Sequence, residues 1–140
     1  ILGRKGSTKT GSLVGTPRYL APEIVLGHAP SSAVDIYASG LVLYEMITGT
    51  RAFPQDNMRS LLKAIVKGDF RPMETAAPGL PRSVYEIVAR ATARAPEHRY
   101  ATIELMLVDI RQAVVTGRLP VMPATDALLA EPLPEAGSVA

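Results

Sequence analysis

The sequence contains no cysteine, no tryptophan and only two histidines among its 140 residues. Without cysteine the chain has no disulfide bond and no thiolate metal site. The two histidines, His28 and His98, lie far apart in the sequence, so we expect no metal site. Aromatic residues make up 5% of the chain and hydrophobic residues 47%. This composition favours a helical core of aliphatic side chains and is compatible with a reducing compartment.

Long apolar runs are also missing. The longest, residues 36–47, contains Ser39 and Glu45 and is too short to span a bilayer, and no segment has the pattern of a signal peptide. The formal net charge of +2 gives little support for binding to nucleic acid. A basic nucleic-acid binder is an alternative because residues 1–22 carry bases and no acid, but no aromatic residues alternate with those bases. We therefore expect a solvated loop there and no nucleic-acid partner.

Hydrophobic periodicity predicts an all-α fold with four main helices. Residues 33–48 are apolar nearly all round, which is typical of a central, buried helix, and Gly49 is placed to end it. The second helix is predicted to follow a cap at Asp56 or Asn57 and to end at Gly68. Its inward positions are Met58, Leu61, Leu62, Ile65 and Val66.

The third and fourth helices are predicted after a loop at residues 69–80. The third begins with Pro81 at its first position and stops before Pro96. The fourth begins after a cap at Thr102, and Gly117 follows its end. The inward positions are Val84, Ile87, Val88 and Ala91 in the third helix and Ile103, Met106, Leu107, Ile110 and Val114 in the fourth.

Two short motifs carry the strongest functional signal. Residues 15–23 read Gly-Thr-Pro-Arg-Tyr-Leu-Ala-Pro-Glu, and the apolar helix that follows contains Asp35 and Gly40. Together with Arg99, these residues resemble the C-terminal lobe of a Ser/Thr protein kinase. The stretch at residues 8–17 is most similar to the bacterial receptor-type branch of that family.

The resemblance also implies a domain organisation. It covers most of the chain and indicates a partial kinase C-lobe over residues 1–117, in which residues 1–23 form the activation and substrate-binding loop. Residues 118–140 are rich in proline and alanine and are predicted to form a disordered tail.

The resemblance gives roles to polar residues of the loop. Thr8 and Thr10 match activation-loop threonines that become phosphorylated, and the equal alternative is that they are ordinary polar loop residues. Thr16 matches the threonine that contacts the catalytic aspartate and helps select serine and threonine acceptors; the alternative is a turn residue. Arg18 and Tyr19 match the segment that lies against the acceptor peptide, and packing is an equally good account of Tyr19.

Four further residues match structural positions of the family. Glu23 and Arg99 match a buried ion pair, in which the planar guanidinium holds the carboxylate with two parallel hydrogen bonds. Asp35 starts an apolar helix, so its carboxylate is expected either to cap its own first turn or to bind backbone elsewhere. Gly40 fits the close approach of another backbone, and the alternative is a tolerated helix glycine.

The other parts of a kinase active site are missing from residues 1–140. They are the glycine-rich lid, the strand lysine with its glutamate, the catalytic-loop aspartate and asparagine, and the DFG aspartate. The sequence therefore offers no catalytic residue. ATP and Mg²⁺ are expected as cofactors of the intact kinase, which transfers the γ-phosphate to serine and threonine residues of proteins. The chain alone is predicted neither to bind nucleotide nor to transfer phosphate.

Two interpretations follow. In the first, the chain is the C-terminal part of a Ser/Thr kinase catalytic domain, and its partners are protein substrates and the missing N-terminal half. In the second, it is a standalone, kinase-derived helical module that binds proteins without catalysis. A cytoplasmic location is expected, either for a soluble kinase or for the cytoplasmic domain of a membrane-anchored one.

Overall fold

The computed structural model describes residues 17–116, and every regular element in this range is helical. The elements are η1 (Pro17–Tyr19), α1 (Pro22–Val25), α2 (Ser32–Thr48), α3 (Met58–Lys67), α4 (Met73–Ala76), α5 (Arg82–Ala91), η2 (Pro96–His98) and α6 (Ile103–Val115). The all-α prediction is confirmed for this range, and the four longest helices are the four expected ones. The short helices α1 and α4 were not predicted, and α4 occupies part of the expected loop at residues 69–80.

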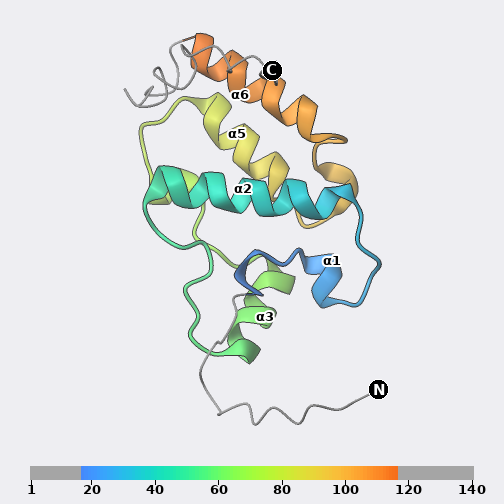
Figure 1. Ribbon diagram of the computed structural model, residues 1–140. Helices are drawn as coiled ribbons and strands as arrows, with labels where there is room; N and C mark the ends of the chain where they lie inside the picture. Colours follow the sequence, from blue (N-terminus) through green and yellow to red (C-terminus); the bar gives the residue numbers. More distant parts are fainter. Residues whose placement is uncertain (1–16, 117–140) are drawn as a thin grey trace, which may run out of the picture.

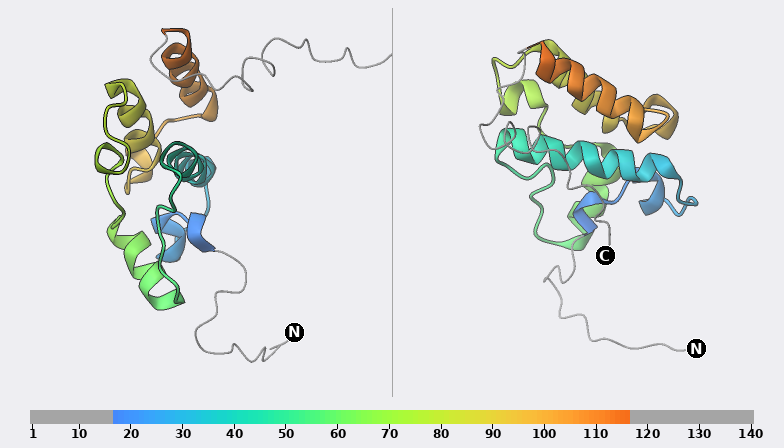
Figure 2. Two further views of the ribbon diagram at one scale, coloured as in Figure 1. Left: turned by 90° about the vertical axis from the view of Figure 1, so that its left-hand side faces the viewer. Right: turned by 45° about the horizontal axis from the view of Figure 1, so that its top comes forward.

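The long helix α2 runs through the middle of the fold. In Figure 1, α5 and α6 lie on one side of α2, and α1 and α3 lie on the other. The left view of Figure 2 looks nearly along α2 and shows the same separation. Neither α2 nor any other helix within residues 17–116 is long and apolar enough to cross a membrane.

Local capping sets the ends of the long helices. The Ser31 side chain accepts a hydrogen bond from the Ala33 N–H at 3.3 Å and starts α2, which Gly49 ends in the left-handed conformation with φ 68°. Asn57, rather than Asp56, caps α3 by accepting from the Ser60 N–H at 2.9 Å. These caps satisfy backbone groups that have no partner within the helix.

One predicted detail needs correction. Pro81 precedes the first turn of α5 as its N-cap residue instead of lying within the turn. Thr102 caps α6 as predicted, and the helix runs to Val115 with Thr116 as its C-cap residue. Thr116 closes the helix by donating its hydroxyl to the Gln112 carbonyl at 2.9 Å.

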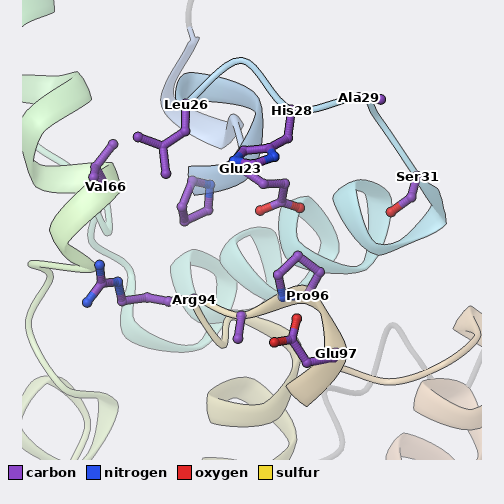
Figure 3. A pocket seen from close by; sticks show the side chains of 11 residues that line it. Glu23, Leu26, His28, Ala29, Ser31, Val66, Arg94, Pro96 and Glu97 are labelled. Carbon is purple, nitrogen blue, oxygen red and sulfur yellow. The ribbon is translucent and has the colours of Figure 1, made fainter.

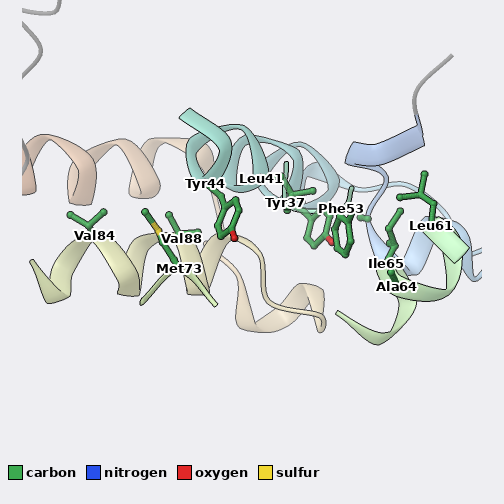
Figure 4. Close-up of a cluster of buried hydrophobic side chains, with 12 residues drawn as sticks. Tyr37, Leu41, Tyr44, Phe53, Leu61, Ala64, Ile65, Met73, Val84 and Val88 are labelled. Carbon is green, nitrogen blue, oxygen red and sulfur yellow. The ribbon is translucent and has the colours of Figure 1, made fainter. Parts of the chain in front are cut away.

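The core consists of two buried clusters. The larger packs α2 against α3, α4, α5 and the loop before α3 (Figure 4), and the smaller joins α2, α5 and α6. Aromatic rings fill more of the core than the aliphatic composition suggested, because Tyr37, Tyr44 and Phe53 are its largest fully buried side chains. The edge of the Phe70 ring contacts Tyr44 and Phe53, with ring centroids 5.4 Å apart in each pair.

One face of α2 is not covered within the described residues. Val42 is 45% exposed and Met46 is 75% exposed, so the central helix α2 is buried or half-buried on its other faces but not on this one within residues 17–116. These side chains and those of α6 line an apolar groove of about 490 Å³. The groove is lined by Asp35, Ala38, Ser39, Val42, Leu43, Met46, Ile103, Met106, Leu107 and Ile110.

Candidate functional site

Helix α1 is the element that places the acidic residue of the first motif. Ala21 and Pro22 are buried, and Pro22 occupies a first-turn position where its missing N–H costs no hydrogen bond. The helix ends at Val25 with Leu26 as its C-cap residue, and the chain then reverses through Gly27 at φ 85°. Glu23 therefore stands in a short helix that is fixed at both ends, and its side chain points toward Arg99.

Glu23 and Arg99 form a bidentate ion pair. The two guanidinium nitrogens of Arg99 donate to the two Glu23 oxygens at 2.6 and 2.8 Å. The Arg99 side chain is 0% exposed and that of Glu23 is 11% exposed. The predicted buried ion pair is present, and it joins segments that lie 76 residues apart in the sequence.

Arg99 also contacts groups other than the Glu23 carboxylate. Its guanidinium also donates to the carbonyls of Ala33 at 2.9 Å and Ala93 at 2.8 Å. The same group lies 4.8 Å from the centroid of the Tyr37 ring, a cation–π distance. Arg99 thus ties α1 to the start of α2 and to the loop before η2.

Electrostatics favours the charged form of Glu23. Burial alone would raise the pKa of its carboxyl group. The hydrogen bonds from Arg99, a backbone hydrogen bond and nearby positive charge outweigh burial, so the pKa lies below its ordinary value. The carboxylate therefore remains ionised, and the pair remains intact, at neutral pH.

Arg18 belongs to the segment that was predicted to lie against an acceptor peptide, and its own side chain points into the fold. The residue is 7% exposed. Its guanidinium donates to the Phe53 carbonyl at 2.5 Å and to the Gln55 carbonyl at 2.8 Å. Arg18 therefore fixes the loop before α3 to the segment before α1 and is part of the interior.

Tyr19 is held by the fold as well. Its hydroxyl donates to the Glu45 carboxylate at 2.6 Å, and its half-buried ring packs against the larger core cluster. The hydrogen bond to Glu45 raises the pKa of the Tyr19 hydroxyl, and burial and the Glu45 charge act in the same direction. These contacts support the packing interpretation of Tyr19.

The structure does not give Asp35 its expected capping role, but it does show the close approach expected at Gly40. The helix is capped by Ser31, whereas the Asp35 carboxylate is exposed and has no hydrogen-bond partner within residues 17–116, so the capping expectation is wrong. Gly40 does permit a close approach. A Cβ atom there would lie 2.7 Å from the Ala91 Cβ and 2.8 Å from the Thr92 methyl group, so α2 and α5 pack closely only because residue 40 is glycine.

Sequence reasoning missed two residues of this region. Glu45 links Tyr19 to the loop by also accepting from the Ala52 N–H at 3.4 Å, and its position as an acid inside an apolar helix was the available signal. The Arg99 guanidinium lies over the ring of Tyr37, and no sequence signal identified that contact. Thr8, Thr10 and Thr16 lie outside the described residues.

Among residues 17–116, no three histidine, aspartate or glutamate side chains gather as a metal site would require. What this range presents is a platform made of α1, the loop before α3 and the start of α2, which the Glu23–Arg99 pair and the hydrogen bonds of Arg18 hold in place.

The family to which this platform belongs follows from comparison with known proteins. The model of the protein kinase domain family matches residues 3–109. The chain therefore belongs to the protein kinase family. A search of solved structures agrees on the fold: the twitchin kinase region of C. elegans superposes with a TM-score of 0.59 and 18% identity, covering 72% of this chain and 22% of that one.

Curated relatives refine the comparison. The chain is 37% identical over 112 residues to the serine/threonine-protein kinase PrkC of Bacillus subtilis, covering 80% of this chain and 17% of the relative. It is 35% identical over 103 residues to the serine/threonine-protein kinase PknB of Mycobacterium tuberculosis, covering 74% and 16%. It is also 37% identical over 98 residues to the tyrosine-protein kinase MasK of Myxococcus xanthus, covering 70% and 15%. The chain thus spans less than a fifth of the length of each of these three relatives.

Proposed function

We propose that residues 1–117 form the C-terminal-lobe part of a Ser/Thr protein kinase catalytic domain, which transfers the γ-phosphate of ATP to serine and threonine side chains of proteins. The Glu23–Arg99 pair is the observation that carries this proposal. It fixes α1 immediately after the segment that contains Thr16. A fixed platform at this point suits the acceptor, because phosphoryl transfer depends mainly on positioning and charge stabilisation.

The choice of acceptor rests on Thr16. Two of the relatives above are named as serine/threonine kinases and one as a tyrosine kinase, so similarity alone leaves the acceptor open. A threonine hydroxyl at position 16 supports serine and threonine acceptors, as the family resemblance implies. Thr8 and Thr10 are proposed phosphorylation sites of the same loop.

The groove between α2 and α6 supports a further part of this proposal. Its apolar lining, with Met46 75% exposed, is a surface that the rest of a kinase domain would cover. That missing N-terminal half is the proposed partner, and it would hold the ligands of ATP and Mg²⁺. When bound, Mg²⁺ neutralises the negative charge on the phosphates. A cytoplasmic location, as a soluble kinase or as the cytoplasmic domain of a membrane-anchored one, is part of the proposal.

A chimera tests the proposal. Residues 3–109 of this chain would replace the matching segment in the catalytic domain of Bacillus subtilis PrkC, and transfer of radiolabelled phosphate to myelin basic protein would be measured. We expect incorporation into serine and threonine, which phosphoamino-acid analysis identifies. A Thr16→Ala chimera is expected to lose transfer while it still binds ATP.

The control is the 140-residue chain alone, which is expected to show no Mg²⁺-dependent phosphate incorporation. Incorporation by this chain would refute the proposal that the N-terminal half of the kinase domain supplies the ligands of ATP and Mg²⁺. A chimera that folds and binds ATP but transfers no phosphate would refute the kinase function itself.

A protein-binding module without catalysis is the second candidate function. One observation favours it: residues 17–116 bury two hydrophobic clusters around α2 without contributions from another chain. A monomeric, cooperatively unfolding 140-residue chain together with an inactive chimera would select this function. An active chimera would select the kinase.

A further inference from the structure

A second cavity lies on the other side of the Glu23 carboxylate, between α1, the end of α3 and the loop before η2. Its volume is about 650 Å³, which is within the usual range for ligand pockets. Figure 3 shows Leu26 above it, Val66 at its left, and Arg94 and Pro96 below, and Pro22 also lines it. Glu23 of the platform lines this cavity, but both of its carboxylate oxygens are bound by Arg99.

The middle of the cavity is apolar. Leu26 is 61% exposed although it faces the cavity, and Pro22, Val66 and Pro96 surround the same space. An exposed leucine in a concave apolar surface favours an apolar ligand group, because binding removes both surfaces from water.

Arg94 provides an exposed charge at the edge of this surface, and its aliphatic stem packs beside Gly68. Gly68 leaves room for the Arg94 stem, since a Cβ atom at residue 68 would lie 3.0 Å from the Arg94 Cδ and 3.1 Å from its Cγ. The Arg94 carbonyl also accepts from Arg99 at 3.3 Å, which fixes the backbone. Within residues 17–116, no carboxylate lies within 4.0 Å of the Arg94 guanidinium, whereas Arg82 and Arg99 both have such a partner. A guanidinium of this kind is suited to a carboxylate.

The other charges of the cavity determine the direction in which a ligand would lie. The Glu23 carboxylate is already occupied by Arg99. Glu97 lines the wall below Pro96, away from the Arg94 guanidinium in Figure 3. An acidic ligand group is therefore attracted toward Arg94 and repelled from Glu97.

We propose that this cavity is a docking site for a segment of a partner protein in which a bulky apolar side chain stands next to an acidic residue. The apolar side chain lies between Leu26, Val66 and Pro96, and the carboxylate pairs with Arg94. Thr8, Thr10 and Thr16, to which the kinase proposal gives its roles in the loop, are not among the described residues that line the cavity, so the inference does not depend on the proposed kinase function.

The experiment is an NMR titration of the ¹⁵N-labelled 140-residue chain without nucleotide. The probe is the peptide acetyl-Ala-Leu-Leu-Glu-Ala-amide, whose blocked ends leave one carboxylate. Two matched peptides replace its Glu by Gln, or both Leu residues by Ala. We expect the first peptide to shift the amide signals of Leu26 and Val66, which line the cavity. The Gln peptide is expected to bind roughly fivefold more weakly, and the Ala peptide roughly tenfold more weakly.

Two protein variants separate the Arg94 charge from general electrostatics. Arg94→Gln is expected to bind the Glu peptide and the Gln peptide equally. Arg82→Gln removes an equally positive, exposed residue outside the cavity and is expected to keep the fivefold preference. Both side chains are at the surface, so both variants retain the fold, which their NMR spectra verify.

Three results would overturn the proposal. The first is an equal affinity of the unaltered chain for all three peptides. The second is a set of shifts at Val42 and Met46, which would place the peptide in the groove between α2 and α6. The third is concentration-dependent shifts of the cavity signals without peptide, which would show that a second copy of the chain occupies the site.

Discussion

The replacement Arg99→Leu tests the interaction that fixes the platform. The guanidinium donates five hydrogen bonds, two to Glu23 and one each to the carbonyls of Ala33, Ala93 and Arg94. Leucine replaces none of them, and the Glu23 carboxylate, whose side chain is 11% exposed, loses its counter-charge. Breaking a buried ion pair in this way costs about 3–5 kcal/mol.

The structure favours the lower half of that range. Glu23 lines the cavity of about 650 Å³, so water can reach part of the carboxylate once the guanidinium is gone. We therefore expect a loss of about 3–4 kcal/mol in the free energy of unfolding. This loss is a large fraction of the roughly 5–15 kcal/mol that stabilises a typical domain.

The assay is urea unfolding of the 140-residue chain, followed by circular dichroism at 222 nm. With a denaturant slope of about 1 kcal/mol/M, the unfolding midpoint is expected to fall by roughly 3 M. The matched control is Arg82→Leu, which removes an ion pair whose side chains are 90% and 62% exposed. Its cost is expected to be below about 1 kcal/mol.

A double-mutant cycle separates the pair from the carbonyl contacts. Glu23→Leu combined with Arg99→Leu removes both charges, so the double variant is expected to be more stable than the sum of the single losses indicates, by about 1 kcal/mol or more. Additive losses would refute the reasoning, because they would show that the two side chains contribute independently. A cost of Arg99→Leu equal to that of Arg82→Leu would refute it as well.

Three further predictions follow from the same contacts. Gly40→Ala places a Cβ atom 2.7 Å from that of Ala91, so we expect the free energy of unfolding in urea to fall by about 1–3 kcal/mol. The control Ser39→Ala, at the neighbouring position in α2, is expected to be close to neutral. A Gly40→Ala variant that is more stable than the unaltered chain would contradict the close packing. Because the pKa of Glu23 is lower in the folded chain than its ordinary value of 4.5, its contribution is fully present above about pH 4.5 and is lost as pH falls through the folded value. Glu23→Gln should therefore flatten the acid limb of a stability-against-pH curve, and an unchanged limb would exclude this role. Thr102→Ala removes the acceptor of the Leu105 N–H and is expected to cost about 1 kcal/mol, measured against Thr102→Ser as a control that keeps the cap and should change little.

The helices were predictable because their signals are local. Apolar spacing located α3 and α6, and residues such as Gly49, Gly68 and Thr102 were correctly placed at helix ends. Their function in a cap depends on the backbone within a few residues, and a sequence window contains that information. The two one-turn helices, α1 and α4, were missed because four residues are too few to show a helical period.

The Asp35 error shows the limit of a local signal. Asp35 and Ser31 are both favourable N-cap residues, and a shift of one turn decides which of them starts the helix. The structure starts α2 after Ser31, so Asp35 falls inside the first turns and its carboxylate faces solvent at the end of the groove. Covering that groove would change the surroundings of Asp35, so its role depends on contacts beyond residues 17–116.

The two buried arginines differ in how far a sequence can predict them. The partner of Arg99 is a carboxylate, and acids are few enough in this chain for a family pattern to identify Glu23 as the one that pairs with it. The partners of Arg18 are the carbonyls of Phe53 and Gln55, and every residue has a carbonyl. No sequence pattern marks such an acceptor, since which carbonyls face inward is decided only when the loop before α3 packs. A buried arginine bound to backbone therefore looks, in the sequence, the same as an arginine that faces a substrate.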